Sequence, residues 1–462
     1  MKTSKYNLFI PYEGEDFILY NVLNRSVLLI GKELKQALEE DNIARIPQEL
    51  RLMAYKNGAL VDDDTDELQI VKVQYWEEKF SYDHLQFIIL PTYACNLRCI
   101  YCYQRSAPHL KGTMNDKTCE QVVKFIIKET HGRRPNSVGI GFFGGEPLTV
   151  ETKVFQIWDS VLERLPSKVE KDVGIITNAT LITEETIKRI ERLKCSGAQV
   201  RIFTTLAGER KLHDSRRIDA KGRGTYDRVL NAVRMLSNTA TPVSIRIDLD
   251  NSTIDCIDRL IADLEENGLR ESVMIRLGKI NLEFCLSEFH PQGIASLDSL
   301  SPIAEVADRF AQRGFVVMEI EPFKPIPNWC SQQTAYTYTI DPEGDLYSCY
   351  DALIYPEHKI GSIDEDGNAK FNTQYYKWYS RDPFVIKECR ECKLLPICLG
   401  GCAFLAWSKH QTFDAPGCYE GFKELIKRSV KRQVIYGMMD EKAKLRLAHH
   451  EDQEQCMDCT TE

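Results

Sequence analysis

Short apolar runs alternate with amphipathic segments across residues 85–317, and this alternation predicts an α/β domain. The strand-like runs are LQFIILPT, VGIGFFGG, VGIITNAT, QVRIFTTL, VSIRIDLD and VMIRLGKI. Segments between them, such as DKTCEQVVKFIIKETHG, TEETIKRIERLKCSG and TYDRVLNAVRMLSN, carry apolar residues at helical spacing. Repeated β/α units imply a parallel sheet with right-handed crossovers. We therefore expect a partial (β/α)6 TIM-like barrel over residues 83–318, with its chemistry at the C-terminal strand ends.

Residues 1–82 have a different pattern, which predicts a separate small module. KYNLFIPY, FILYNVL and SVLLIG alternate or run apolar like short strands, with a hairpin turn at Asn24-Arg25. KELKQALEE and PQELRLMAYKNG look helical, the second with Pro47 near its start and Gly58 after its end. A three-stranded sheet followed by short helices is typical of a winged-helix-like module. The alternative is a simple N-terminal cap on the next domain.

The pattern changes again after about residue 319, to short strands, turns and cysteines, as in TYTIDPEGDLYSCYD. A helix is expected at roughly residues 419–449. We assign residues 319–430 to a cysteine-rich domain and residues 431–462 to a C-terminal helix and tail.

Composition and charge exclude several classes of protein. The chain has 462 residues, 43% of them hydrophobic and 27% charged, which is ordinary for a globular protein of two or three domains. The net charge of −9 argues against a broad nucleic-acid-binding surface. The first twenty residues carry acids and a proline where a signal peptide would be apolar, and no apolar run is long enough for a membrane span. We therefore expect a cytoplasmic protein that binds neither nucleic acid nor membrane.

The sixteen cysteines change this picture, because clustered thiols in a reducing compartment indicate metal rather than disulfides. Three of them, Cys95, Cys99 and Cys102, lie within eight residues directly after the first predicted strand. Three thiolates that converge on a [4Fe–4S] cluster leave one iron without a protein ligand, so that it can bind a small molecule. The alternative is a zinc site completed by a distant residue.

The stretch CNLRCIYCY resembles the signature of the radical S-adenosylmethionine (radical SAM) superfamily. This resemblance implies that the open iron binds the amino and carboxylate groups of S-adenosyl-L-methionine. It also implies that one electron cleaves this cofactor to methionine and a 5′-deoxyadenosyl radical, which abstracts a hydrogen atom from substrate.

Two further features agree with the resemblance. FFGGEPL, after the second predicted strand, is similar to the family's GGEP motif, whose backbone would meet the methionine amino group. A simple turn is the alternative. Tyr101 resembles the aromatic residue that packs on the adenine, with ordinary loop packing as its alternative. The residues of the motif are Gly144, Gly145, Glu146 and Pro147.

The remaining cofactor candidates lie on the next three strands. In IITNAT, Thr177 and Asn178 end the strand and resemble the family's residues on the ribose side of the cofactor. TTLAGERKLHDSRR resembles a loop that holds the methionine carboxylate. In that loop Ala207 replaces the usual acid and Glu209 the usual proline, so the match is weaker there. Arg246, in SIRID, reaches the same region or pairs with an internal acid. The candidates are Thr177, Asn178, Thr205, Arg217 and Arg246.

Seven later cysteines resemble the SPASM domain of peptide-modifying radical enzymes, in the pattern that ends with CRECKLLPICLGGC and a final cysteine. The resemblance implies two auxiliary [4Fe–4S] clusters, hence three in all. It implies that one is ligated by Cys389, Cys392, Cys398 and Cys418, and the other by Cys330, Cys349 and Cys402. A zinc ribbon at the first pair is the alternative.

Residues 331–348 contain no cysteine where some relatives carry one, so the cluster of Cys330, Cys349 and Cys402 has an open iron in this interpretation. A substrate thiolate is one occupant, since iron binds thiolates well. Cys456 or Cys459 of the tail, or neither, are the alternatives. The other cysteines are expected to be packing residues: Cys119, Cys195, Cys256 and Cys285.

These resemblances imply an oxidoreductase that acts on a peptide. The N-terminal module resembles leader-recognition elements of ribosomal-peptide maturases, which take a precursor's leader as an added strand. We expect thioether cross-linking of a cysteine, with an external flavodoxin- or ferredoxin-like electron donor. The nearest alternative is an anaerobic sulfatase-maturating, formylglycine-generating enzyme. In those relatives an aspartate that acts as a base follows the second SPASM cysteine, whereas here that position is Tyr350 and Asp351 comes next. Carbon–carbon cross-linking, epimerisation and a non-catalytic electron-transfer role are further alternatives.

Overall fold

The computed structural model describes residues 1–239, 241–285, 291, 293–294, 296–318 and 330–439. Its centre is a curved parallel sheet, which confirms the α/β class predicted from the alternation. All six predicted strands are present, and a seventh follows them along the edge. In chain order these parallel strands are β6 (His84–Ile89), β7 (Ser137–Phe142), β8 (Glu170–Ile176), β9 (Ala198–Thr205), β10 (Val243–Leu249), β11 (Val273–Lys279) and β12 (Val316–Met318).

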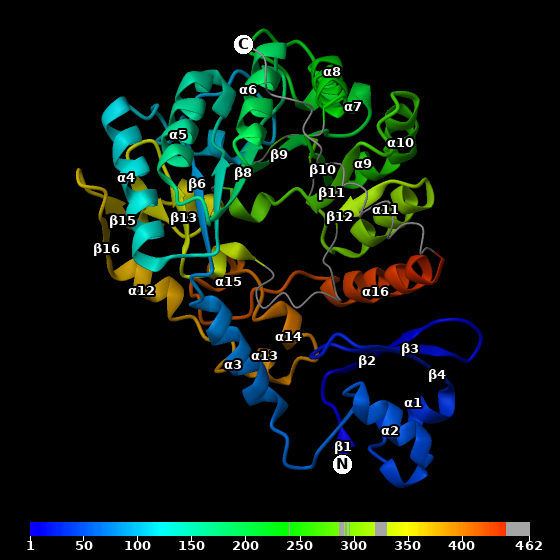
Figure 1. Ribbon diagram of the computed structural model, residues 1–462. Helices are drawn as coiled ribbons and strands as arrows, with labels where there is room; N and C mark the ends of the chain where they lie inside the picture. The colour runs from blue at the N-terminus through cyan, green and yellow to red at the C-terminus, as the bar shows by residue number, and fades with distance from the viewer. Residues whose placement is uncertain (240, 286–290, 292, 295, 319–329, 440–462) are drawn as a thin grey trace.

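Helices cover the outer face of this sheet, as Figure 1 shows, and leave the inner, concave face to the chemistry. The crossovers between successive strands place each helix on the same side, as expected for parallel β/α units. These helices are α4 (Asp116–Arg133), α5 (Glu151–Arg164), α6 (Glu184–Cys195), α7 (Arg210–Arg216), α8 (Tyr226–Ser237), α9 (Asn251–Asp255), α10 (Ile257–Glu266) and α11 (Ser301–Gln312).

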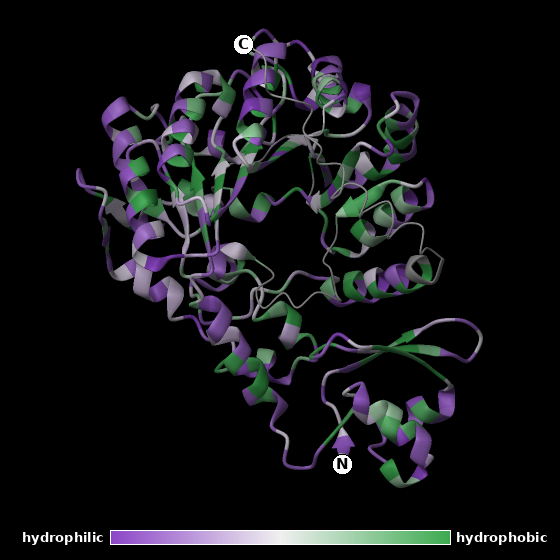
Figure 2. Ribbon diagram, in the orientation of Figure 1, coloured by the Kyte–Doolittle hydropathy of each residue, from purple (hydrophilic) through white to green (hydrophobic). Residues whose placement is uncertain are grey.

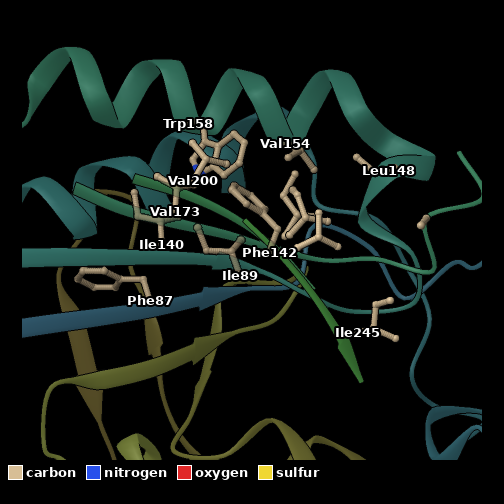
Figure 3. Close-up of a cluster of buried hydrophobic side chains, with 14 of the residues drawn as sticks. Phe87, Ile89, Ile140, Phe142, Leu148, Val154, Trp158, Val173, Val200 and Ile245 are labelled. Atoms are coloured by element: carbon tan, nitrogen blue, oxygen red, sulfur yellow. The ribbon is translucent and has the colours of Figure 1, made fainter. Parts of the chain in front are cut away.

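The main core lies between the strands and these helices. Figure 3 shows Phe142 beside Trp158 of α5, while Phe87 packs on Phe125 of α4. The Phe142 ring meets the indole edge-on, with centroids 5.2 Å apart. Truncating such a fully buried aromatic residue to alanine costs about 3–5 kcal/mol. Figure 2 shows the same division, with apolar residues along the strands and polar residues on the outer helices. Since strand side chains alternate, the residues between these core positions point to the concave face.

The sheet continues past β6 into the cysteine-rich region, which the sequence pattern did not reveal. β13 (Thr337–Ile340) pairs with β6 in parallel, and antiparallel strands extend the sheet further. The two regions therefore share one backbone hydrogen-bond network. The remaining elements are β14 (Asp345–Tyr347), β15 (Lys359–Ile363), β16 (Ala369–Phe371), α12 (Thr373–Tyr379), α13 (Lys387–Glu391), α14 (Leu395–Cys398), α15 (Ala403–His410) and α16 (Phe422–Met439).

The N-terminal module has the predicted three-stranded sheet and helices, with one helix more than the pattern indicated. β3 (Phe17–Asn21) lies between β2 (Asn7–Pro11) and β4 (Val27–Ile30), all antiparallel. One face of this sheet packs on its own helices and the other on α13, α14 and α16. The other elements are β1 (Lys2–Thr3), β5 (Leu60–Val61), α1 (Lys32–Glu39), α2 (Gln48–Lys56) and the additional α3 (Glu67–Lys79). The winged-helix resemblance stays a prediction.

Helix α3 ends on a buried cation that joins it to the cysteine-rich region. Lys79 is 2% exposed, and its ammonium donates hydrogen bonds to the Tyr75 hydroxyl at 2.9 Å and the Arg381 carbonyl at 2.8 Å. Three aromatic rings surround it within 6 Å of their centroids. Burial, followed by the charge of Arg381, lowers the pKa of Lys79 to about 7.

This lysine predicts a pH-dependent stability. The unfolded chain holds the Lys79 proton up to about pH 10.4, while the folded chain releases it near pH 7, so stability rises with pH in that window by at most about 1.4 kcal/mol per pH unit. We expect Lys79→Met to flatten this rise and to be more stable than the wild type at pH 7. Thermal unfolding midpoints between about pH 6.5 and 9 test it. Lys377→Met, at an exposed position, is the control, and parallel profiles for Lys79→Met and wild type would contradict the assignment.

Candidate active site

The three-cysteine loop leaves β6 at its carboxyl end, where the barrel rule places chemistry. Its backbone is held by the segment after α7: the Arg98 amide donates to the Ile218 carbonyl at 2.7 Å, and the Ile100 amide to the Arg216 carbonyl at 3.0 Å. The loop is thus fixed by a segment more than 100 residues away in the chain.

The glycines of the GGEP motif let their turn lie directly against this loop. The Gly145 amide donates to the Thr92 carbonyl at 3.0 Å, and the Glu146 amide to the Ala94 carbonyl at 2.8 Å. A Cβ atom on Gly145 would lie 2.2 Å from the Ala94 carbonyl oxygen, and one on Gly144 would lie 2.5 Å from that of Thr92. Gly144 also has φ +127°, a conformation that side chains disfavour. Only glycine fits at either position.

Glu146 connects the turn to the end of β8. Its carboxylate is buried and accepts hydrogen bonds from the Thr177 hydroxyl at 2.7 Å and the Asn178 amide at 2.6 Å. Burial raises the pKa of Glu146, and these bonds oppose the shift. The Asn178 side-chain amide in turn donates to the side-chain oxygen of Asn96 at 2.9 Å and points to the Cys95 sulfur at 3.9 Å. The structure therefore brings the predicted ribose-side pair to the cysteine loop.

Arg217 lies on the other side of the same loop. Its guanidinium donates to the Tyr101 hydroxyl at 3.1 Å, and its buried Nε has no hydrogen-bond partner among the described residues. Burial lowers the pKa of Arg217, but Tyr101 and the thiols of Cys99 and Cys95 outweigh it and raise the pKa. A cation beside two thiols, with an unused donor, is suited to hold an anionic group of a cofactor.

The departures from the family pattern in the loop before Arg217 are accommodated locally. Glu209 supplies the N-terminal cap of α7, accepting from the Lys211 amide at 2.8 Å, and the Ala207 amide donates to His213 Nδ1 at 3.3 Å. His213 is fully buried, and burial lowers its pKa to about 2, so it is a neutral acceptor. The loop keeps its shape without the usual acid and proline.

Thr205 and Arg246 are neighbours on adjacent strands, both on the concave face. The Arg246 guanidinium donates to Asp248 at 2.8 Å, so the internal acid considered as its alternative partner is present. The structure thus places Arg246 in an ion pair, and its role toward the cofactor stays a prediction. Ile176 and Met318, both solvent-exposed, lie on the same face.

The charges of the seven later cysteines influence one another in two sets, and the ligand role of each set stays a prediction. Burial and the neighbouring thiols raise the pKa of Cys389 to about 11, and the same causes raise those of Cys398 and Cys418. In the second group, burial and the Cys402 thiol raise the pKa of Cys330 to about 12, and burial, Asp351, Cys402 and Cys330 raise that of Cys349. Mutual repulsion of this kind indicates thiols that lie near one another.

Backbone amides point at one sulfur in each of the three groups. The Leu97 amide donates to Cys95 Sγ at 3.3 Å, the Leu394 amide to Cys392 Sγ at 3.4 Å, and the Leu405 amide to Cys402 Sγ at 3.3 Å. Hydrogen bonds to sulfur stabilise the thiolate form that ligates iron. The donor set therefore fits iron–sulfur clusters in all three places.

Arg381 holds the loops of the auxiliary groups together, a role that sequence reasoning missed. It is 1% exposed, and its guanidinium donates to the carbonyls of Gly400, Gly401, Phe413 and Ala415. Those carbonyls flank cysteines from both groups. No local signal marks Arg381, because its partners lie up to 34 residues away.

The cysteines outside the three groups differ in their burial. Burial raises the pKa of Cys285 to about 11, with further contributions from Cys102 and Asp351, and its low exposure agrees with the packing role predicted for it. Cys195 is exposed, unlike the buried Cys119 and Cys256. Cys456 and Cys459 lie outside the described residues.

Comparison with known proteins agrees with this geometry. Residues 89–264 match the Radical SAM superfamily. These residues form a radical SAM domain. A cysteine-type anaerobic sulfatase-maturating enzyme of Clostridium novyi (strain NT) is 23% identical over 342 residues, which cover 69% of this chain and 87% of that protein. The mycofactocin maturase MftC of Mycolicibacterium smegmatis is 25% identical over 351 residues, which cover 72% and 81%.

Solved structures share the fold of this chain. anSMEcpe with bound AdoMet has a TM-score of 0.59 at 19% identity and covers 79% of this chain and 98% of its own. Streptococcus suis SuiB bound to the precursor peptide SuiA has a TM-score of 0.52 at 18% identity and covers 90% and 98%. In the described part of this chain, no helix is both long and apolar enough to cross a membrane.

The cofactors of the enzyme are S-adenosylmethionine and [4Fe–4S] clusters. When bound, they supply a radical that abstracts a hydrogen atom. The residues that would hold the first cluster are Cys95, Cys99 and Cys102. Around it, Arg217 offers an unused donor, and the GGEP turn and Asn178 line the loop. The site therefore fits its cofactors.

The glycine turn predicts a sharp mutational effect. In Gly145→Ala the new methyl group would meet two backbone carbonyls at 2.2 and 2.4 Å, so the turn or the cysteine loop must move. We expect the iron content of the first site to fall and S-adenosylmethionine to bind about tenfold more weakly or worse. Iron analysis and equilibrium dialysis of the reconstituted enzyme measure both. Gly132→Ala is the matched control, since nothing lies within 4 Å of its added Cβ. Unchanged binding in Gly145→Ala would show that the contact is unimportant.

Proposed function

We propose that this enzyme is a maturase that abstracts hydrogen from a ribosomally made precursor peptide and joins a cysteine sulfur to a carbon as a thioether. The relatives named above are maturases, and SuiB binds a precursor peptide. The observation that supports the specific reaction is that the charges of Cys330, Cys349 and Cys402 influence one another, with no fourth cysteine among the described residues that influence Cys330 and Cys349.

In this proposal each group of thiols has its own cluster. Cys389, Cys392, Cys398 and Cys418 ligate one auxiliary cluster fully, while Cys330, Cys349 and Cys402 leave one iron of the other for a substrate thiolate. Cys456 or Cys459 is the rival fourth ligand.

Asp351 connects this second group to the radical site. Its charge raises the pKa of Cys349, Cys330 and Cys285, and Cys285 is also influenced by Cys102. Burial raises the pKa of Asp351 to about 6, and Arg246 opposes this shift. A peptide bound beside Asp351 would therefore lie between the first cysteine loop and the three-thiol group.

The cross-link removes two hydrogens from the peptide. One leaves the carbon as an atom and ends on 5′-deoxyadenosine. The other leaves the cysteine thiol as a proton, and the remaining electron passes to the auxiliary clusters and on to an external acceptor. The donor that starts the reaction is a flavodoxin- or ferredoxin-like protein in this proposal.

We further propose that the precursor's leader adds to β4 as a strand. β4 is an edge of its sheet. The Asn21 amide donates to the Ser26 carbonyl, so by alternation the backbone groups of Val27 and Leu29 point away from β3. Leu29 is half exposed. The opposite edge is occupied, because Lys393 and Lys431 donate to the carbonyls of Asn7 and Pro11.

Formylglycine generation from a sulfatase is the second candidate, favoured by the sulfatase-maturating relatives. The identity of residue 350 argues against it, because Tyr350 occupies the position of the aspartate base of those relatives. Asp351 lies one residue further on. Carbon–carbon cross-linking needs no open auxiliary iron and is the third candidate.

Intact mass tests the reaction. We expect co-expression with a cysteine-containing precursor peptide encoded beside the gene to remove two hydrogen atoms per modified cysteine and to protect that thiol from alkylation. The Cys95→Ala enzyme should leave the peptide unchanged and form no 5′-deoxyadenosine. A precursor with serine in place of cysteine is the substrate control. Loss of two hydrogens with the thiol still alkylatable would contradict thioether formation and favour formylglycine or a carbon–carbon bond.

Proline tests the leader site. Leu29→Pro removes an amide that points out of the sheet, so the module keeps its own ladder but cannot bond an added strand there. We expect leader affinity to fall about tenfold or more, and Leu29→Ala, which keeps the amide, to bind more tightly than Leu29→Pro. Fluorescence anisotropy of a labelled leader measures this, with circular dichroism to confirm folding. Equal affinities for Leu29→Pro and wild type would place the leader elsewhere.

A further inference from the structure

Two arginines lie side by side on the concave face of the sheet. Arg246 of β10 and Arg276 of β11 are direct partners in the parallel register, with Thr205 beside the first and Met318 beside the second. Figure 1 shows β10 and β11 as neighbours in the wall that curves around this face. Adjacent like charges are unfavourable unless negative charge compensates them.

Arg246 has its compensation within the sheet. Its guanidinium donates to Asp248, and the pair lies over Gly278: a Cβ atom there would be 3.0 Å from Asp248 Oδ1 and 3.1 Å from Arg246 Nη2. The glycine therefore makes room for this ion pair. Asp248 is the largest influence on the pKa of Arg246, which it raises.

Arg276 has no such partner. Within the described ranges, no carboxylate forms an ion pair with it and no group accepts a hydrogen bond from it. Burial and the charge of Arg246 lower the pKa of Arg276, while Tyr350, Asp248 and Cys330 oppose the shift. Its side chain is nevertheless exposed to solvent. It is thus surrounded by protein and still accessible to a small group that carries a negative charge.

This position differs from the cofactor side of the site. Arg217 is influenced by Tyr101, Cys99 and Cys95 of the first cysteine loop, whereas Arg276 is influenced by Tyr350 and Cys330 of the auxiliary side. The register sets Arg276 on the concave face, one strand further than Arg246 from Thr205 of β9, and this is the side on which we propose that the peptide binds. Guanidinium groups bind carboxylates through two parallel hydrogen bonds, so a carboxylate is the ligand that this group fits.

We propose that Arg276, with Arg246 beside it, binds a carboxylate of the peptide substrate, either an acidic side chain or the C-terminal carboxylate. The inference rests on the proposed action on a peptide and adds a specificity to it: the modified segment carries its negative charge close to the reacting residues.

Three small probes test this on the enzyme reconstituted with its clusters and S-adenosylmethionine. They are N-acetyl-glutamate N-methylamide, its neutral glutamine counterpart, and N-acetyl-alanine with a free carboxylate. By ligand-observed NMR, we expect a carboxylate probe to bind about tenfold more tightly than the glutamine probe. Whichever carboxylate probe binds more tightly identifies a side chain or a C-terminus. Arg276→Gln should abolish the difference, Arg276→Lys should keep part of it, and the exposed Arg234→Gln should keep all of it.

Other outcomes overturn the inference. Equal or undetectable binding of all three probes does so directly. If Arg276→Gln weakens S-adenosylmethionine more than the carboxylate probes, the carboxylate belongs to the cofactor. If it only lowers an auxiliary cluster's reduction potential or the unfolding midpoint, the guanidinium is a counter-charge or a structural partner.

The proposed function and the carboxylate-binding inference are contradicted by different results. A wild-type enzyme that forms no 5′-deoxyadenosine under strong reductant would remove that function. Equal affinity for charged and neutral probes in a wild type that does form it would remove this inference alone.

Discussion

The amides of Gly145 and Glu146 donate to carbonyls of the cysteine loop, and this backbone contact organises the site. It is possible only because two glycines bring the turn closer to the loop than any side chain allows. Glu146 then extends the contact to Thr177 and Asn178, and Asn178 returns to the Cys95 sulfur. On the opposite side, residues 216–218 hold the same loop. A loop held on both sides by backbone hydrogen bonds can keep three sulfurs in place with little regular structure of its own.

The two faces of the parallel sheet divide stability from chemistry. The outer face packs aliphatic and aromatic residues against the helices, and the concave face carries Thr205, Arg246, Asp248 and Arg276. Alternation along each strand makes this division possible within one short segment, because neighbouring residues point in opposite directions. Mutations at the core positions of Figure 3 should therefore act through folding, and those at the alternating positions through binding.

The cysteine-rich region depends on the same sheet, since β13 adds directly to β6. This pairing brings Cys330 and Cys349 to the concave face of a domain that ends before them. Arg381 supplies the second connection by donating to carbonyls next to cysteines of both auxiliary groups. Lys79 adds the N-terminal module to that point through the Arg381 carbonyl. The Lys79 bond to a carbonyl thus joins the N-terminal module to the cysteine-rich region, and the β13–β6 pairing joins that region to the parallel sheet.

Hydrophobic periodicity in the sequence determined the six strands, and the resemblance carried by short motifs indicated the class of enzyme. Cluster ligands and strand periods are encoded over a few residues, so they can be found without a fold. Tertiary structure alone decided that Arg246 pairs with Asp248, and that Arg381 and Arg276 have their present surroundings. These depend on strand register and on contacts between distant segments. The physical reason is that a charge takes its role from the groups that surround it, and the chain order does not specify those groups.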